Sequence, residues 1–276
     1  MIETLYNLVS ILLCSAPFCL FMLAFVGMAF LFFRVISSQW TPPTAEQMQA
    51  KANELEARVN GMVGRLSAWR PDALDDLSTD WDATWSRFGS TLNARGVIPS
   101  HSRPKEAAYV TFALWTRGAS QPEGILYART SRHVFEYRLS RAGVEISVDK
   151  ALLGRLQPDG QLLDAERRVI GEAKRPGGMP VLFQIGPVSV VHDERAPDYP
   201  LILNGRRVGQ IANPPVQRFN FIQLQRATPP LAVVPAPDIS EQEALWLTAL
   251  AILQVAGWNV IESVWTASRV HRPSFR

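Results

Sequence analysis

Near the C-terminus, residues 240–264 read SEQEALWLTALAILQVAGWNVIESV, and this stretch decides the fold that the sequence predicts. Ser240 followed by Glu243 is typical of a capping box, in which each side chain bonds the backbone N–H of the other residue at the start of a helix. From Ala244 onward the predicted helix is apolar on nearly every face. A helix that is hydrophobic all round is buried either in protein or in lipid.

Lipid is one possible environment, because the length of this helix borders on that of a membrane span. The polar residue Gln254 in the middle, with Asn259 and Glu262 near the end, favours burial in protein. We therefore expect a sheet wrapped around a central helix. The residues predicted to form that helix core are Leu245, Leu247, Leu250, Ile252, Leu253, Val255 and Trp258.

The chain before this helix is predicted to be rich in β-strands. From about Lys105 the apolar residues alternate or form short runs, which Gly- and Pro-containing turns separate, giving about twelve candidate strands. They are 107–116, 124–131, 134–139, 143–148, 152–156, 167–173, 181–185, 188–192, 201–203, 207–211, 220–225 and 232–234. Asp159-Gly160 and Asn204-Gly205 are predicted tight turns, because glycine accepts positive φ at little steric cost.

A short pattern of apolar residue, glycine, polar residue and apolar residue recurs in this region. It occurs at Leu153–Leu156, Ile170–Ala173 and Val208–Ile211. Glycine inside a strand marks a bend, a bulge or a close approach of backbone. Curved and closed sheets need such points, so the pattern favours a barrel over a flat sandwich.

Over Glu106–Trp265 the chain resembles the tubby C-terminal-like superfamily. The resemblance rests on the strand-rich body, the repeated glycine hairpins and the final apolar helix that acidic residues precede. That superfamily includes the tubby-like proteins, the phospholipid scramblases and the LURP-one-related proteins. The resemblance is one of layout, and it implies a closed barrel of about twelve strands around a central hydrophobic helix. The phosphoinositide-binding basic residues of tubby and the calcium loop of the scramblases do not align onto this chain.

The N-terminal segment predicts a membrane anchor. No charged residue occurs from Thr4 to Phe33, and this run exceeds the ~20 apolar residues that a helix needs to cross a bilayer. A cleaved signal peptide is the alternative. Signal peptides have a basic N-terminal flank and a shorter apolar core than the run found here. Because Arg34 and Lys51 follow the segment and no basic residue precedes it, the positive-inside rule places the rest of the chain in the cytoplasm.

Between the anchor and the sheet, the spacing of apolar residues predicts two amphipathic helices. The first begins at a capping box, Thr44 with Gln47, and carries an apolar stripe at alternating steps of four and three. That stripe either forms a short coiled coil between copies or packs on its own domain, which we favour. Its residues are Met48, Ala52, Leu55, Val59, Met62 and Leu66. A second helix is predicted around Trp81, Trp85, Phe88 and Leu92.

Composition and motifs restrict the chemistry. The chain has 276 residues and a net charge of +3, which is far from the dense positive field of a nucleic-acid-binding protein. Its two cysteines, Cys14 and Cys19, both lie in the N-terminal apolar run, so the remainder has no disulfide framework and no Cys-based zinc site. No GxxxxGK[ST], GxGxxG, HExxH, GxSxG or CxxC motif occurs. We expect no enzyme, metal or cofactor, although a site assembled from distant strands leaves no local motif.

Three groups of basic residues are candidates for binding anionic lipid headgroups. A cation near an anionic membrane contributes about 1 kcal/mol of binding free energy. The alternative is ordinary surface charge carried by turns. The candidates are Arg167, Arg168, Lys174, Arg175, Arg206 and Arg207.

The predicted organisation is a transmembrane anchor over 1–39, a helical stalk over 40–96, a β-barrel with a central helix over 97–266 and a basic tail over 267–276. The leading hypothesis is a single-pass protein of the cell membrane, whose cytoplasmic part is a non-enzymatic binding or scaffold module that contacts anionic phospholipid. One alternative is a scramblase-like lipid transporter with the terminal helix in the bilayer. Another is a structural subunit of a larger membrane complex, held as a homo-oligomer by the apolar stripe.

Overall fold

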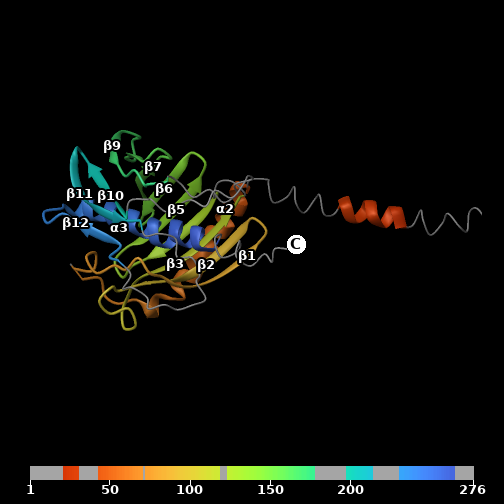
Figure 1. Cartoon of the computed structure of the whole chain (residues 1–276), viewed down its shortest axis with the longest axis horizontal. Helices are drawn as coiled ribbons and strands as arrows, with labels where there is room; N and C mark the ends of the chain where they lie inside the picture. Colours follow the sequence, from red (N-terminus) through yellow and green to blue (C-terminus); the bar gives the residue numbers. More distant parts are fainter. Residues whose placement is uncertain are drawn as a thin grey trace, which may run out of the picture. The chain divides into compact units, whose positions relative to one another are not determined.

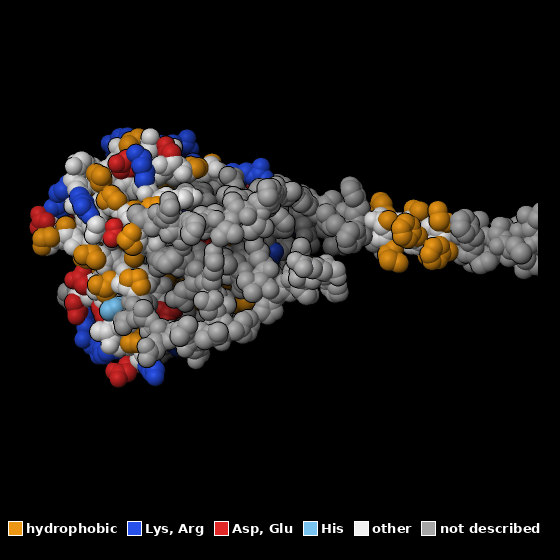
Figure 2. Space-filling model, in the orientation of Figure 1, with side chains coloured by type: hydrophobic (Ala, Val, Ile, Leu, Met, Phe, Trp, Pro, Cys, Tyr) orange, Lys and Arg blue, Asp and Glu red, His pale blue; other side chains and the backbone are white. Residues whose placement is uncertain are grey.

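The computed structural model describes residues 21–30, 43–70, 72–118, 123–177, 197–213 and 230–264. The chain divides into two compact units, Met1–Thr41 and Pro42–Arg276. In the first unit, Phe21–Phe30 is an apolar helix with every residue exposed, and Figure 2 shows its hydrophobic side chains as one continuous surface. The rest of the predicted anchor lies outside the described residues.

The second unit is built on one antiparallel sheet of twelve strands, in which each strand pairs with the next along the chain (Figure 1). The strands are β1 Asp82–Phe88, β2 Thr91–Pro99, β3 Ala108–Arg117, β4 Glu123–Arg129, β5 Val134–Ser140, β6 Gly143–Val148, β7 Ala151–Leu156, β8 Gln161–Leu163, β9 Val169–Glu172, β10 Asp198–Leu203, β11 Arg206–Ala212 and β12 Val233–Pro235. The prediction of a mainly β fold is confirmed. The predicted strands 181–185, 188–192 and 220–225 lie outside the described residues.

The terminal helix is the core of this unit. Helix α3 (Glu241–Ile252) continues into a π-helical segment, η2 (Leu253–Asn259), and the helix extends to Val264. It is long and apolar enough to cross a membrane, but 89% of its apolar stretch is buried inside the unit. Side chains from β2–β8 and β10–β12 pack with it in one hydrophobic core, and Figure 1 shows the strands around it. The predicted burial in protein is therefore confirmed.

The predicted central-helix residues all belong to this core. Leu247, Leu250, Ile252, Leu253, Val255 and Trp258 are buried, and Leu245 is partly buried against the same cluster. The capping box of Ser240 and Glu243 is also present, with both of its hydrogen bonds. The helix has almost no polar face, which suits burial by the sheet together with the segment that contains Leu74 and Leu77.

The sheet is not closed into a barrel, contrary to the expectation from the sequence. Strands β1 and β12 end the sheet and do not pair with each other. Where closure would occur, Leu77 forms an isolated bridge with Ser100 after β2, and Ser78 forms one with Leu231 before β12. Most side chains of β1 are exposed. A short irregular segment spans the gap instead.

Helix α2 (Ala45–Asn60) covers the outer face of β3 and β4. Ala52, Leu55 and Val59 are buried there, and Met48 and Met62 pack beside them. The apolar stripe is thus occupied by the chain's own sheet, and the favoured packing is confirmed over the coiled coil. Because Ala52, Leu55 and Val59 are covered by the chain's own sheet, they offer no free surface to a second copy, and oligomerisation through this stripe stays a prediction. The helix is also shorter than predicted: it ends at a Gly61 cap, followed by a 3₁₀ turn, η1 (Val63–Arg65), and Leu66 lies beyond both.

The second predicted stalk helix is wrong, because its residues form β1, a turn and the start of β2. Trp85 pairs with Ala94, and Gly89 makes the turn with a φ of 56°. A step of four residues places two side chains on one face of a strand as well as of a helix. The β-forming residues of DATWSRF and the pairing with β2 decide between the two. The sheet therefore begins at Asp82, within the segment predicted as stalk.

The recurring glycine pattern marks three β-bulges. Each bulged residue is the apolar residue just before the glycine: Leu153, Ile170 and Val208 are skipped in the pairing of their strands. A Cβ on Gly154 would lie 2.1 Å from the Leu163 carbonyl oxygen and 2.9 Å from the Trp246 ring. The bulges bend the strands, and the glycine lets helix and sheet approach closely, as the pattern predicted.

The two ends of the wrapped sheet differ. The β4–β5, β6–β7, β8–β9 and β10–β11 turns lie at the end where α3 begins, here called the Ser240 end. The β1–β2, β3–β4, β5–β6 and β7–β8 turns lie at the other end, here called the Val264 end. Asn60, the last residue of α2, binds Arg129 at the Ser240 end of β4. Helix α2 therefore begins toward the Val264 end.

Candidate functional site

Gln254, in the π-helical segment η2, lies at the centre of a buried hydrogen-bond network. Its Oε1 accepts hydrogen bonds from Arg175 Nε at 3.0 Å and from the Tyr199 hydroxyl at 3.2 Å. Its Nε2 donates to Asn213 Oδ1 at 3.2 Å and to Asn259 Oδ1 at 2.8 Å. One side chain thus links the terminal helix to the segments that follow β9 and β11 and to β10.

The π-helical geometry explains how the helix supplies two members of this network. A π-turn closes on residues five apart, and Gln254 and Asn259 are five apart. Their side chains meet in a direct hydrogen bond, whereas in a regular α-helix residues five apart do not face each other. Such single π-turns within α-helices occur frequently at functional sites, which makes this segment the leading candidate.

An ion pair completes the network at the Val264 end. Arg175 Nη2 lies 2.9 Å from Glu262 Oε2, and the two side chains are only 7% and 14% exposed. Charges buried to this extent need a partner, since their desolvation is costly. Burial raises the pKa of the Tyr199 phenol despite the opposing effect of the nearby Arg175 cation. Tyr199 therefore remains a neutral hydrogen-bond donor to Gln254 at physiological pH.

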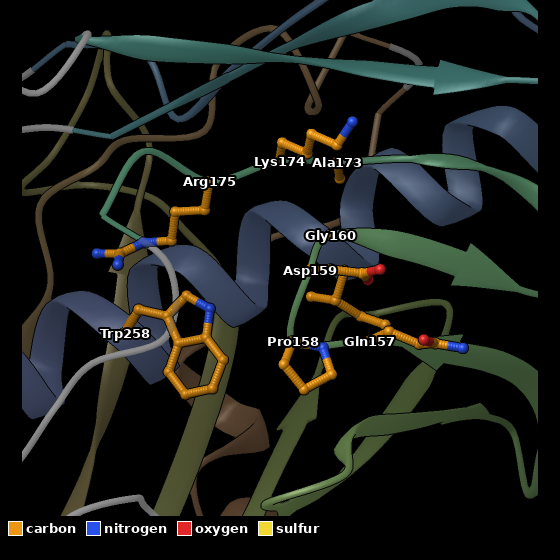
Figure 3. Close-up of a pocket in the computed structure, with 9 residues that line it drawn as sticks. Gln157, Pro158, Asp159, Gly160, Ala173, Lys174, Arg175 and Trp258 are labelled. Carbon is orange, nitrogen blue, oxygen red and sulfur yellow. The ribbon is translucent and has the colours of Figure 1, made fainter.

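A pocket of about 260 Å³ lies beside this network. In Figure 3 the indole of Trp258 and the side chain of Arg175 lie on one side of it, and the β7–β8 turn lies on the other. Its lining residues are Leu156, Gln157, Pro158, Asp159, Gly160, Ala173, Lys174, Arg175 and Trp258. Gly160, with a φ of 90°, makes the turn that forms one wall, as predicted for Asp159-Gly160.

The lining residues suit noncovalent binding. Lys174 and Asp159 supply opposite charges, and Trp258 supplies an aromatic surface. Lys174 already pairs with Glu172 at 2.7 Å, a contact that raises the pKa of its ammonium group. Among the described lining residues there is no histidine, cysteine, serine or threonine. Within the described ranges, no three His, Cys, Asp or Glu residues are grouped to hold a metal ion.

The structure divides the predicted headgroup-binding residues between the two ends of the sheet. Arg167, Arg168, Arg206 and Arg207 lie at the Ser240 end, in or beside the β8–β9 and β10–β11 turns. Lys174 and Arg175 lie at the Val264 end, where they line the pocket. Arg175 is buried, so the surface role predicted for it does not fit its position: its guanidinium is held by Glu262 and Gln254.

Several of these cations also have structural partners. Arg168 binds Asp164 and Glu166 and closes the β8–β9 turn. Arg206 binds Asp238 and Glu243, each at 2.7 Å. The Ser240 amide first, and then Arg206, lower the pKa of the Glu243 carboxyl. Arg206 therefore reinforces the cap of α3.

Arg167 and Arg207 are the remaining two candidates. Both are exposed, and in the part of the chain that the structure describes neither pairs with a carboxylate. The basic tail over 267–276 lies outside the described residues. Headgroup binding by these residues therefore stays a prediction.

The helical members of the network could be recognised from the sequence, and their partners could not. The polar residues Gln254, Asn259 and Glu262 interrupt an otherwise apolar helix. Their partners Tyr199 and Asn213 lie on or beside strands far away in the chain, and only the folded sheet brings them together. The spacing of five between the two helical amides is the one local sign of the π-turn.

The comparisons with known proteins place no constraint on this site. No family model, no curated protein and no solved structure matches the chain. The likeness to the tubby C-terminal-like superfamily therefore stays a prediction from layout.

Proposed function

We propose that the chain is a membrane-anchored, non-enzymatic binding module, with its N-terminal apolar segment in the membrane and its wrapped sheet outside it. One observation carries the proposal. Of the two apolar helices in the described residues, Phe21–Phe30 is exposed along its whole length, whereas 89% of the apolar stretch in Glu241–Val264 is buried in protein.

The exposed helix needs a cover that its own unit does not provide. Seven large apolar side chains of this ten-residue helix are between 46% and 69% exposed. Full burial of one such side chain is worth about 1.5–3 kcal/mol, so leaving all of them in water is unfavourable. The helix lies inside the uncharged run from Thr4 to Phe33, which is the pattern of a membrane span. Lipid is therefore the cover that we propose.

The buried helix argues against the scramblase-like alternative. Residues Trp246–Ile261 are all buried, and they pack against strands on every side. Placing them in a bilayer would expose the inner face of the sheet and break the bonds of Gln254. The subunit alternative also loses its main support, because the apolar stripe on α2 is already covered by β3 and β4.

The binding part of the proposal rests on the pocket and its surroundings. The pocket offers opposite charges and an aromatic surface, and its amine, Lys174, is paired with Glu172. The pocket lies at the Val264 end, toward which α2 begins.

Membrane extraction tests the anchor directly. Membranes from cells that express the full chain are washed in alkaline carbonate, alongside membranes from cells that express a variant lacking residues 1–41. We expect the full chain to stay in the pellet and the variant to be released as a folded protein. If the shortened variant also stays in the pellet, another part of the chain is embedded in the membrane. If the full chain is released by the wash, no part of it is embedded and the proposed anchor is wrong.

A further inference from the structure

The tip of the β1–β2 hairpin exposes two aromatic side chains. Phe88 is 77% exposed and Trp85 is 40% exposed. Both precede the turn at Gly89, on a strand whose side chains are mostly exposed. An aromatic pair at the tip of a hairpin adds nothing to the core, so the wrapped sheet alone does not account for it.

The hairpin carries its acidic residue away from the tip. Asp82 begins β1, opposite Val97, and pairs with Arg65, whereas Arg87 lies two residues before Gly89. Arg87 Nε donates a hydrogen bond to the Gly89 carbonyl at 3.1 Å, which fixes the arginine at the turn. Arg117, on the neighbouring strand β3, pairs with Thr91 just after the turn. On β4, Glu123 lies opposite Arg117, so Arg87 is the cation that stands beside Phe88 at the turn.

The hairpin tip lies at the end of the sheet from which the chain leads to its anchor. The β1–β2 turn is at the Val264 end, and α2 begins toward the same end. Residues 31–42 join Phe30 to Pro43. At no more than about 3.6 Å per residue, the stretch from Phe30 to Pro43 spans at most about 47 Å, which leaves the Val264 end free to reach the membrane surface.

We infer that the hairpin tip, formed by Trp85, Arg87 and Phe88, inserts into the headgroup region of the bilayer that holds the N-terminal segment. This inference rests on the proposed anchoring. Trp and other aromatic side chains are favoured at the boundary between headgroups and acyl chains. Arginine beside them is attracted to anionic lipid. The tip thus makes a second contact with the membrane and fixes the orientation of the sheet.

Val169 provides a matched control position. It is 64% exposed and begins β9, next to Arg167 and Arg168 at the Ser240 end. A membrane contact through those arginines would bring Val169, rather than Phe88, to the lipid. The two positions therefore separate the hairpin from the predicted headgroup-binding residues.

Fluorescence quenching by brominated lipid tests the inference on the full chain. Phe88→Cys and Val169→Cys are each made with Cys14→Ser and Cys19→Ser, labelled with an environment-sensitive fluorophore and reconstituted in vesicles of phosphatidylcholine and phosphatidylserine. We expect brominated acyl chains to quench the label at position 88 severalfold more than at position 169. Equal quenching, or stronger quenching at position 169, would overturn the inference.

Two further measurements make the outcome unambiguous. Retention of each labelled chain in the alkaline wash shows whether the N-terminal anchor is in the membrane. If a chain is retained but its label at position 88 is exposed to water, the insertion of the hairpin is contradicted and the anchor is not. Arg87→Gln is expected to reduce the quenching at position 88 only in vesicles that contain phosphatidylserine. A label shielded from water but insensitive to brominated lipid would indicate that a second copy covers the hairpin, which also contradicts the inference.

Discussion

At the scale of single residues, Gln254 determines how the terminal helix is joined to the sheet. A buried amide is favourable only when its hydrogen bonds are made, and both the oxygen and the nitrogen of this amide have hydrogen-bond partners. Arg175 Nε and the Tyr199 hydroxyl both donate hydrogen bonds to the Gln254 Oε1. The side chain therefore fixes the rotation of the helix within the sheet as well as adding stability.

Gln254→Met should destabilise the protein by roughly 2–3 kcal/mol, because it keeps the volume but leaves buried donors without their acceptor. Denaturant unfolding of the detergent-solubilised full chain measures the change. Leu253→Met, at the neighbouring buried position, changes only packing and should cost less than about 1.5 kcal/mol. Equal effects of the two variants would show that the network contributes nothing beyond shape.

Asp76 is a second residue on which local structure depends. Its carboxylate accepts hydrogen bonds from Ser100 Oγ at 2.5 Å, from the Ser102 amide at 2.8 Å and from the Tyr109 hydroxyl at 3.2 Å. Burial acts to raise its pKa, but these hydrogen bonds outweigh burial and the pKa is lowered. The carboxylate holds the segment that spans the gap between the two ends of the sheet, since Leu77 follows directly.

Asp76→Asn should therefore reduce stability by about 1–3 kcal/mol at neutral pH, where the charge-assisted bonds are lost. Because the folded-state pKa lies below the ordinary value of 3.8, the contribution of the carboxylate is complete above that pH. It disappears as pH falls through the folded-state pKa. Unfolding curves of both proteins from neutral pH to below pH 3.8 test this, and a difference that stays constant in acid would contradict it.

At the scale of elements, the bulges show how a local pattern shapes the sheet. Three hairpins repeat the same bulge before the same glycine. Gly154 and Gly209 also leave room for Trp246 and Leu247 of α3, whose atoms lie 2.9 Å from the positions that a Cβ would take. The strands therefore bend at the points where the helix passes closest.

Gly154→Ala should cost about 1–3 kcal/mol or more, because its Cβ would overlap both the Leu163 carbonyl and the Trp246 ring. Gly64→Ala is the matched control, since nothing lies within 4 Å of the added atom. Thermal unfolding of the two variants gives the comparison. A similar melting temperature for both would mean that the helix does not press against the sheet at Gly154.

Elements with strong local signals could be predicted from the sequence. Short-range chemistry is enough to predict the two capping boxes and most of the alternating strands. It also predicts the turns at Gly160 and Asn204-Gly205. Strand β1 could not be predicted in this way, since its spacing fits a helix as well and its pairing with β2 decides the outcome. The stripe on α2 was recognised, but the sheet surface that covers it is formed by β3 and β4, which are distant in the sequence.

The candidate site was only partly predictable for a related reason. An apolar helix interrupted by Gln254 and Asn259 indicates polar partners without identifying them. Arg175 was predicted as a surface cation because sequence shows its charge and not its burial. Only the fold brings it within reach of Glu262, 87 positions further along the chain, at 2.9 Å.

At the scale of the whole molecule, two apolar segments of similar composition have opposite environments. The sheet buries one of them without closing into a barrel, since the bridges of Leu77 and Ser78 replace a pair between β1 and β12. The other is exposed in its own unit, and we propose that lipid covers it. The terminal helix is therefore expected to stay on one side of the membrane.

Cysteine labelling in sealed vesicles tests this claim most directly. Gln242→Cys and Ser274→Cys flank the terminal helix in the sequence, and each is made in the full chain with Cys14→Ser and Cys19→Ser. A membrane-impermeant maleimide then reports which side each position occupies. We predict that both positions are labelled from the same side of the vesicle, and labelling from opposite sides would show that the helix crosses the bilayer.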